Sequence, residues 1–145
     1  MNLSEHFTLA EFTASQTATR RGLNNIPSPA MVKKLAWLAS RMERVREVLG
    51  VPLQINSAYR SASVNRSIGG AATSQHCKGE AVDFTAPQYG DCRAICQAIM
   101  SAGIEYDQLI FEGSWVHISF SEQPRKSTLT AHFSNGGVRY TNGIA

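Results

Sequence analysis

The sequence predicts a single α+β domain, residues 1–145, in which helices flank a mainly antiparallel β-sheet. A chain of this length is sufficient for one compact domain and short for two. Helical and extended patterns follow one another irregularly, which argues against a regularly alternating parallel sheet. In the second half, two apolar runs flank a Gly-Ser dipeptide, a pattern typical of an antiparallel β-hairpin.

Composition excludes several classes of protein. The 43% hydrophobic and 17% charged content is typical of a globular domain rather than a disordered chain. No apolar run approaches the roughly 20 residues of a membrane-spanning helix. The net charge of +3 is too small to indicate nucleic-acid binding, although it is compatible with an anionic polymer such as cell wall. No secretory signal is visible at the N-terminus, so we expect cytoplasmic synthesis and three reduced cysteines without a disulfide framework.

Two helices are expected in the first half of the chain. A capping-box pattern at residues 8–11 predicts a short helix that ends near Ser15. The strongest helical pattern spans residues 28–49, with Ser28 suited to the N-cap and Gly50 to the position after the last turn. Its basic residues lie mostly off the apolar stripe and are interspersed with glutamates, which indicates a solvated face. The stripe consists of Met31, Leu35, Leu38, Met42, Val45 and Leu49.

The remaining elements are strands and one further helix. Five extended segments are expected, at residues 51–56, 81–85, 108–112, 115–120 and 138–140. A loop over residues 57–79 separates the first two strands. The helix spans residues 91–102, because Asp91 suits its N-cap. Cys92 and Cys96 lie one turn apart on this helix, which predicts core positions rather than metal ligands.

Two of the four histidines stand in unusual contexts. His76 lies on an expected turn, seven residues before Asp83, which sits within an apolar strand. Burying an unpaired carboxylate is strongly unfavourable, and a divalent cation would satisfy it. The imidazoles of His76 and His117 with the Asp83 carboxylate, and a fourth position left to water, are the ligand set of a catalytic zinc site. For each residue alone, a hydrogen-bonded structural role is the alternative.

The surroundings of these residues resemble a known family. The string Ser-x-His-x-x-Gly-x-Ala-x-Asp, formed by Ser74, His76, Gly79, Ala81 and Asp83, is similar to the first zinc motif of the D-Ala-D-Ala carboxypeptidase-type metallopeptidases. That family belongs with lysostaphin and the hedgehog signalling domain in one superfamily. Residues 115–117 (Trp-Val-His) resemble its second motif, and residues 57–61 its upstream arginine motif. Residues 3–12, with Asn65 and the Gly69-Gly70 pair, resemble the compact branch found in bacteriophages and prophages.

The resemblance covers residues 3–120 and implies a hedgehog/D-Ala-D-Ala-peptidase-like fold. It implies that His76, Asp83 and His117 bind Zn²⁺, and that Arg60 stabilises the anionic oxygen of the tetrahedral intermediate or holds a substrate carboxylate. Ser74 would orient the substrate or a zinc ligand. The implied activity is a zinc peptidase that cleaves the stem peptide of peptidoglycan. Without the motif, Arg60 would be interpreted as a surface ion-pair residue.

One departure from the family pattern concerns the general base. Many relatives place a catalytic carboxylate three residues before the last zinc histidine, where this chain has Ser114. A serine cannot accept a proton at neutral pH without help. With residues 113–114 as a two-residue turn, Glu112 and His117 become diagonal neighbours on one face, about 7 Å apart. We therefore predict Glu112 as the general base and Asp107 as the fallback; a solvated carboxylate is the alternative for Glu112.

The sequence is compatible with more than one scissile bond and with more than one function. The scissile bond is either a D-Ala terminus or the L-Ala–D-Glu bond. The chain is also compatible with a non-catalytic wall-binding or structural phage component that retains the metal site, which Ser114 would favour. The resemblance further implies an endolysin of a phage or prophage, which acts on the wall after release from the cytoplasm. We expect a monomer whose partner is the stem peptide, with no nucleic-acid partner.

Overall fold

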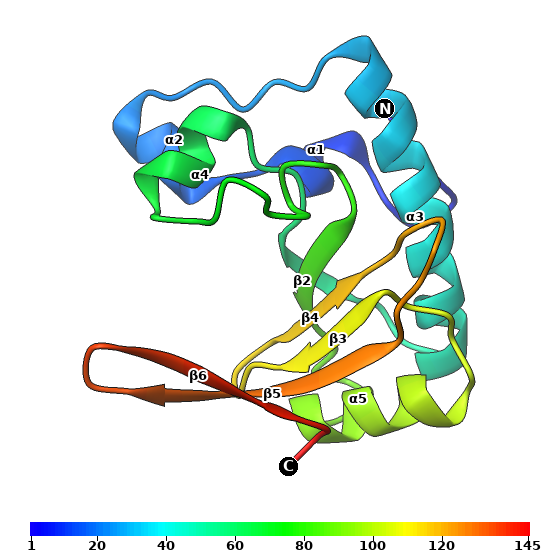
Figure 1. The fold of residues 1–145 in the computed structure, drawn as a ribbon. Helices are drawn as coiled ribbons and strands as arrows, with labels where there is room; N and C mark the ends of the chain where they lie inside the picture. The colour runs from blue at the N-terminus through cyan, green and yellow to red at the C-terminus, as the bar shows by residue number, and fades with distance from the viewer. The chain divides into compact units, whose positions relative to one another are not determined.

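A computed structural model describes residues 1–145 (Figure 1). Its helices are α1 (Leu9–Thr13), α2 (Gln16–Arg21), α3 (Pro29–Leu49), α4 (Ala62–Ser67) and α5 (Cys92–Ser101). Its strands are β1 (Gln54–Ser57), β2 (Ala81–Thr85), β3 (Gln108–Phe111), β4 (Val116–Ser119), β5 (Ser127–Ser134) and β6 (Gly137–Asn142). They form one six-stranded sheet in the order β1-β2-β4-β3-β5-β6. The α+β prediction is confirmed.

The chain divides into two compact units. The first comprises residues 1–43 and 55–82, and the second comprises residues 44–54 and 83–145. Helix α3 contributes residues to both units. None of the helices combines the length and the apolar character needed to cross a bilayer.

Helix α3 has the ends that its sequence predicts. The Oγ of Ser28 accepts a hydrogen bond from the backbone N–H of Met31 at 3.1 Å, as an N-cap does. At the other end, the Gly50 N–H donates to the Arg46 carbonyl at 2.8 Å, and Gly50 adopts a φ of +70°. The predicted apolar stripe is buried at its centre, where Leu35, Leu38, Met42 and Val45 are inaccessible to solvent.

The first unit contains two helices that the sequence analysis did not predict. Helix α2 begins after Ser15, whose side chain accepts a hydrogen bond from the Ala18 N–H. Helix α4 lies inside the expected loop and begins after Ser61, which caps it through the Val64 N–H. Both helices have only six residues, so neither is long enough to show an apolar period. The features of the sequence that could have predicted these two helices were their N-cap serines, Ser15 and Ser61.

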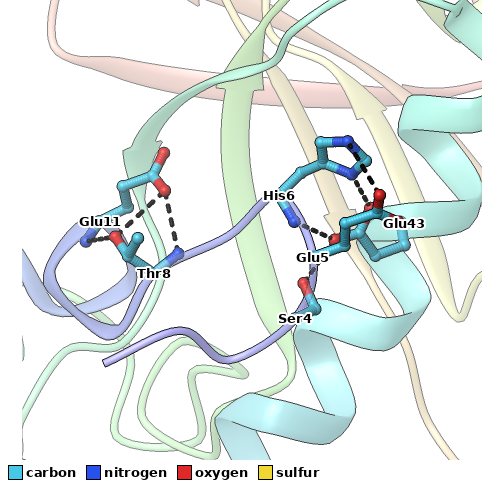
Figure 2. Close-up of polar contacts among 6 residues, drawn as sticks. All are labelled: Ser4, Glu5, His6, Thr8, Glu11 and Glu43. Carbon is cyan, nitrogen blue, oxygen red and sulfur yellow. Dashed lines mark hydrogen bonds and ion pairs between the residues drawn. The ribbon is translucent and has the colours of Figure 1, made fainter.

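The N-terminal segment is held to α3 by one carboxylate (Figure 2). Glu43 accepts hydrogen bonds from the Ser4 hydroxyl at 2.5 Å and from the His6 backbone N–H at 2.7 Å, and it lies 2.7 Å from His6 Nδ1. The neighbouring capping box of α1 is also formed, because the Glu11 carboxylate accepts from the Thr8 N–H at 3.0 Å while the Thr8 hydroxyl accepts from the Glu11 N–H at 3.2 Å. Burial raises the pKa of Glu43, but the bonds from Ser4 and His6 outweigh it and lower the pKa overall.

Replacing Glu43 by Gln is expected to lower the free energy of unfolding at pH 7 by about 1–2 kcal/mol, because charge-assisted hydrogen bonds are lost. A carboxylate whose folded pKa is lowered stabilises the protein above its unfolded pKa of about 4.3, and this contribution is lost as the pH falls through the folded pKa. Denaturant unfolding at pH 7 and pH 3 should therefore show the gap between wild type and variant narrowing in acid. The exposed Glu47→Gln serves as control, and a gap unchanged between the two pH values would contradict the assignment.

The second unit holds most of the sheet. Strands β3 and β4 pair antiparallel with Ile110 opposite His117, as the hairpin prediction requires. Strands β5 and β6 are also antiparallel, whereas β5 pairs with β3 in parallel, so the sheet is mixed. The predicted edge strand at residues 138–140 lies within β6. Strand β5 was not predicted, although its residues alternate between polar and apolar with the period of two that marks a half-buried strand.

Helix α5 supplies apolar side chains to the second unit. Asp91 caps it by accepting from the Ala94 N–H at 2.8 Å, and the helix packs against β3 and β4. Cys92 and Cys96 are buried and free of disulfides. Burial, with the neighbouring Cys92, raises the pKa of Cys96 to about 12, so this thiol stays protonated. The prediction of core cysteines is confirmed.

Candidate active site

His76 is held by backbone contacts within the first unit. Its side chain is buried, and Nδ1 lies 2.7 Å from the carbonyl oxygen of Ala58, which can only accept, so Nδ1 carries the proton. The lone pair of the neutral ring is then on Nε2. The His76 N–H donates to the Oγ of Ser74 at 3.2 Å, and the His76 carbonyl accepts from the backbone N–H of Arg60 at 3.2 Å. The structure thus brings Ser74 and Arg60 beside this histidine.

Gly79 closes the turn that carries His76. It adopts a φ of +69°, and a Cβ atom at this position would lie 2.7 Å from the Sδ of Met31 on α3. A side chain would therefore be strained both by the backbone conformation and by the contact. The Gly79 N–H lies 3.4 Å from the His76 carbonyl, which completes the turn. The glycine of the His-x-x-Gly motif is explained by this geometry.

Asp83 and His117 form a pair within the second unit. Asp83 lies on β2 and His117 on β4, and the Asp83 Oδ1 is 2.9 Å from the His117 Nδ1. Both side chains are largely buried, with 18% and 14% of their surface exposed. Successive side chains of a strand point to opposite faces of the sheet, so Asp83 lies on the other face from Val82 and Phe84, which are inaccessible to solvent. This alternation allows a carboxylate within an apolar strand.

These three residues make up the one group of metal-ligand side chains found in the chain. His76, Asp83 and His117 each offer one ligand atom, and these atoms all lie within 4.8 Å of one another. Ligands of tetrahedral zinc at about 2.0–2.1 Å from the ion lie about 3.3 Å from one another. The donor types, two imidazoles and one carboxylate, are those of a zinc site.

Glu112 lies at the end of the β3–β4 hairpin. Its N–H donates to the Trp115 carbonyl at 3.1 Å, and Gly113 adopts a φ of +81°, so residues 113–114 form the predicted tight turn. Burial raises the pKa of Glu112, His117 lowers it and Asp83 raises it, and the net shift is upward. The pKa of Glu112 is thus affected by Asp83 and His117, which lie on the neighbouring strands β2 and β4.

Asp107, the fallback base, lies at the opposite end of β3. Five residues of extended chain separate it from Glu112, a distance of about 16 Å. Its carboxylate is buried and accepts hydrogen bonds from Arg125 through Nε at 2.9 Å, Nη2 at 2.8 Å and the backbone N–H at 3.0 Å. This bidentate pair joins the start of β3 to the segment that leads into β5.

Tyr140 on β6 is a residue of this region that the sequence analysis did not single out. Burial raises its pKa, and the charges of Glu112 and Asp83 raise it further, so its phenol lies within electrostatic reach of both carboxylates. The signal that could have identified it was the alternation along residues 127–134. Recognising β5 from that pattern would have placed β6, and with it Tyr140, in the same sheet as the hairpin.

Comparison with known proteins identifies the class. A profile of the family Peptidase M15 matches residues 5–119, which is well over half of the chain and includes all three candidate ligands and Glu112. The chain belongs to the peptidase M15 family. It is also similar to the zinc D-Ala-D-Ala carboxypeptidase of Streptomyces albus G, with 34% identity over 64 residues. That similarity covers 43% of this chain and 25% of the relative, so the chain spans about a quarter of the relative's length. The family predicted from the motifs is confirmed.

Proposed function

We propose that this protein is a zinc-dependent peptidase that hydrolyses the stem peptide of bacterial peptidoglycan. The observation that carries the proposal is the convergence of His76, Asp83 and His117 to within 4.8 Å. The family membership supports peptidase chemistry, and the similar carboxypeptidase supports both zinc and a D-Ala-D-Ala substrate. Cleavage of the L-Ala–D-Glu bond is the alternative within the same chemistry.

Zinc is proposed to bind the Nε2 of His76, a carboxylate oxygen of Asp83 and an imidazole nitrogen of His117. The carbonyl of Ala58 supports this assignment, because a histidine ligand that donates its other N–H to a carbonyl is held in the required tautomer and made more basic. Zinc bound here would supply a Lewis acid that activates water for attack at neutral pH.

The chain's own residues would then perform the acid–base chemistry. Glu112 takes a proton from the attacking water as the oxygen bonds to the amide carbon, and it delivers that proton to the leaving nitrogen as the C–N bond breaks. An upward-shifted pKa suits a group that must both accept and donate a proton. Asp107 is unsuited to this role, because it is buried at the far end of β3 and bound to Arg125.

Arg60 and Ser74, which both contact the backbone of His76, are proposed to act beside it. The Arg60 guanidinium would stabilise charge on the carbonyl oxygen or hold a substrate carboxylate, a role that a planar, permanently charged group suits. Ser74 would orient His76, since its hydroxyl already accepts the His76 N–H. Both roles depend on the motif resemblance as well as on these backbone contacts.

We further propose that residues 1–145 act as one peptidase domain and as a monomer. Lysis of the cell wall after release from the cytoplasm, as in a phage or prophage endolysin, is the biological role that the motif resemblance favours. The second candidate is a non-catalytic wall-binding component that keeps the metal site. Ser114, at the position where many relatives have a carboxylate, is the observation that favours this alternative.

Digestion of purified peptidoglycan tests the proposal. Protein loaded with zinc is expected to cleave soluble stem peptides, and mass spectrometry of the products identifies the bond: free D-Ala for a carboxypeptidase, or new L-Ala and D-Glu ends for an endopeptidase. A chelator should stop the reaction and added zinc restore it. If the protein retains zinc but breaks no bond of the stem peptide, the result would instead favour the non-catalytic wall-binding component.

A further inference from the structure

The β5–β6 hairpin has one face in common with the active site. Residues paired directly across strands point to the same side of a sheet, and so do residues two apart on one strand. Ile110 of β3 pairs with His117 on one side and with Leu129 of β5 on the other. Along β5, Ala131 and Phe133 therefore lie on the His117 face. The pairs of β5 with β6 extend this face to Tyr140 and Val138.

This part of the hairpin continues beyond strand β3. Pairing between β3 and β5 ends at Phe111 and Thr130, so Glu112 follows at the level of Ala131, and Ala131 pairs with Tyr140. Residues 131–134 of β5 thus have only β6 beside them, and Figure 1 shows this end of the hairpin extending away from β3 and β4. The hairpin also lies outside residues 5–119, the part that matches the peptidase family.

The extended end carries a continuous exposed apolar surface. Phe133, Tyr140 and Val138 have 57%, 48% and 44% of their surface exposed. The ring of the half-buried Trp115 packs against Phe133 with 5.9 Å between ring centroids, which joins this surface to the hairpin that bears Glu112. Single exposed apolar residues are common on protein surfaces, but a contiguous group of them next to a candidate active site indicates a binding surface. We call Trp115, Phe133, Val138 and Tyr140 the aromatic surface.

The two faces of the hairpin differ in chemistry. The opposite face carries His132, Arg139 and Thr141, with His132 Nε2 2.8 Å from the Thr141 hydroxyl. No side chain of the aromatic surface is charged. The stem peptide is rich in charged groups, whereas the pyranose rings of the glycan present C–H faces and acetyl methyl groups that pack well on aromatic rings. Tyrosine and tryptophan also add a polar group at the edge of such a contact.

Resting on the proposed peptidase function, we propose that the aromatic surface binds the sugar rings of the glycan strand from which the stem peptide branches. Substrate would then be held at two places, with the peptide at Glu112 and the glycan along β5 and β6. The position of Tyr140 supports this continuity, because it pairs with Ala131, which lies at the level of Glu112. The surface would favour glycan-linked stem peptides over free ones.

The test compares stem peptide that carries its disaccharide with the same peptide alone. In the Phe133→Ser/Val138→Ser double variant, the ratio of kcat/KM for the linked peptide to that for the free peptide is expected to fall about tenfold, through KM rather than kcat. Arg139→Gln, on the opposite face of the same strand, is the matched control and should leave the ratio unchanged. Zinc content and thermal unfolding establish that each variant is folded. An unchanged ratio in the double variant would overturn the proposal.

A binding measurement separates this inference from the peptidase proposal. Peptide-free glycan strands should co-sediment with the wild-type protein and about tenfold less with the double variant. Wild-type protein that hydrolyses stem peptides but fails to bind the strands overturns only the role of the aromatic surface. If the wild-type protein binds the glycan strands but hydrolyses no stem peptide, the binding role of the aromatic surface is supported and the peptidase proposal is contradicted. A dimer of the wild-type protein that the double variant abolishes would mean that a second copy covers this surface instead.

Discussion

Replacing Glu112 by Gln is expected to lower the turnover of stem peptides by a factor of about 10²–10⁴ while zinc stays bound. The amide has nearly the shape of the carboxylate and cannot accept a proton, so only the acid–base step is lost. Glu112 is not among the three side chains whose ligand atoms converge, and metal content should therefore remain at the wild-type level. Turnover is measured with excess soluble peptide, and bound metal by elemental analysis of the same sample.

Two control variants make this result specific. Glu105→Gln removes an exposed carboxylate just before β3 and should leave turnover unchanged. Asp107→Asn breaks the buried pair with Arg125, so it should lower the free energy of unfolding by about 1–3 kcal/mol and leave the turnover of the folded protein near wild type. Full activity of Glu112→Gln, with loss in Asp107→Asn at equal folded fraction, would transfer the role of general base to Asp107.

Replacing His117 by Ala should remove both the bound zinc and the activity. Loss of one of three protein ligands is expected to weaken zinc binding by more than the roughly 10–100-fold that follows loss of a ligand's hydrogen-bond partner. After dialysis, wild-type protein should retain about one zinc per chain and the variant almost none. The removal also leaves the Asp83 carboxylate, 18% exposed, without the imidazole 2.9 Å away.

Thermal unfolding gives a second readout that does not depend on catalysis. Zinc at about 1,000 times its dissociation constant should add about 4 kcal/mol to the stability of the wild-type protein and little to that of the variant. His132→Ala is the matched control, because His132 lies on a strand of the same sheet and contacts Thr141. Equal stabilisation of wild type and His117→Ala by zinc would exclude His117 as a ligand.

The sequence allowed the local structure of the site to be predicted where short-range rules apply. The caps of α3 and α5 follow from Ser28 and Asp91, and the register of the β3–β4 hairpin follows from its Gly113–Ser114 turn. That register places Ile110 opposite His117, which is the basis for proposing Glu112. The burial of Cys92 and Cys96 likewise follows from their spacing on one helix face.

Long-range pairing could not be predicted in the same way. The parallel pairing of β5 with β3 joins residues that no turn connects, so the sequence between them carries no signal for it. The hydrogen bonds from Arg125 to Asp107 depend on the same pairing, and so does the place of Tyr140 in the sheet, because β6 pairs with β5. Helices α2 and α4 were missed for a different reason, because each is too short to show a period.

The contact between His76 and Ala58 has a consequence for how mutations would damage the protein. The acceptor is a main-chain oxygen, so no single substitution can delete it, and the orientation of the imidazole is insensitive to side-chain chemistry at that position. It is sensitive to size, because Ala58 is inaccessible to solvent and a larger residue would have to displace the backbone. A larger residue in place of Ala58 would thus misalign the imidazole nitrogens of His76 in a protein that still folds.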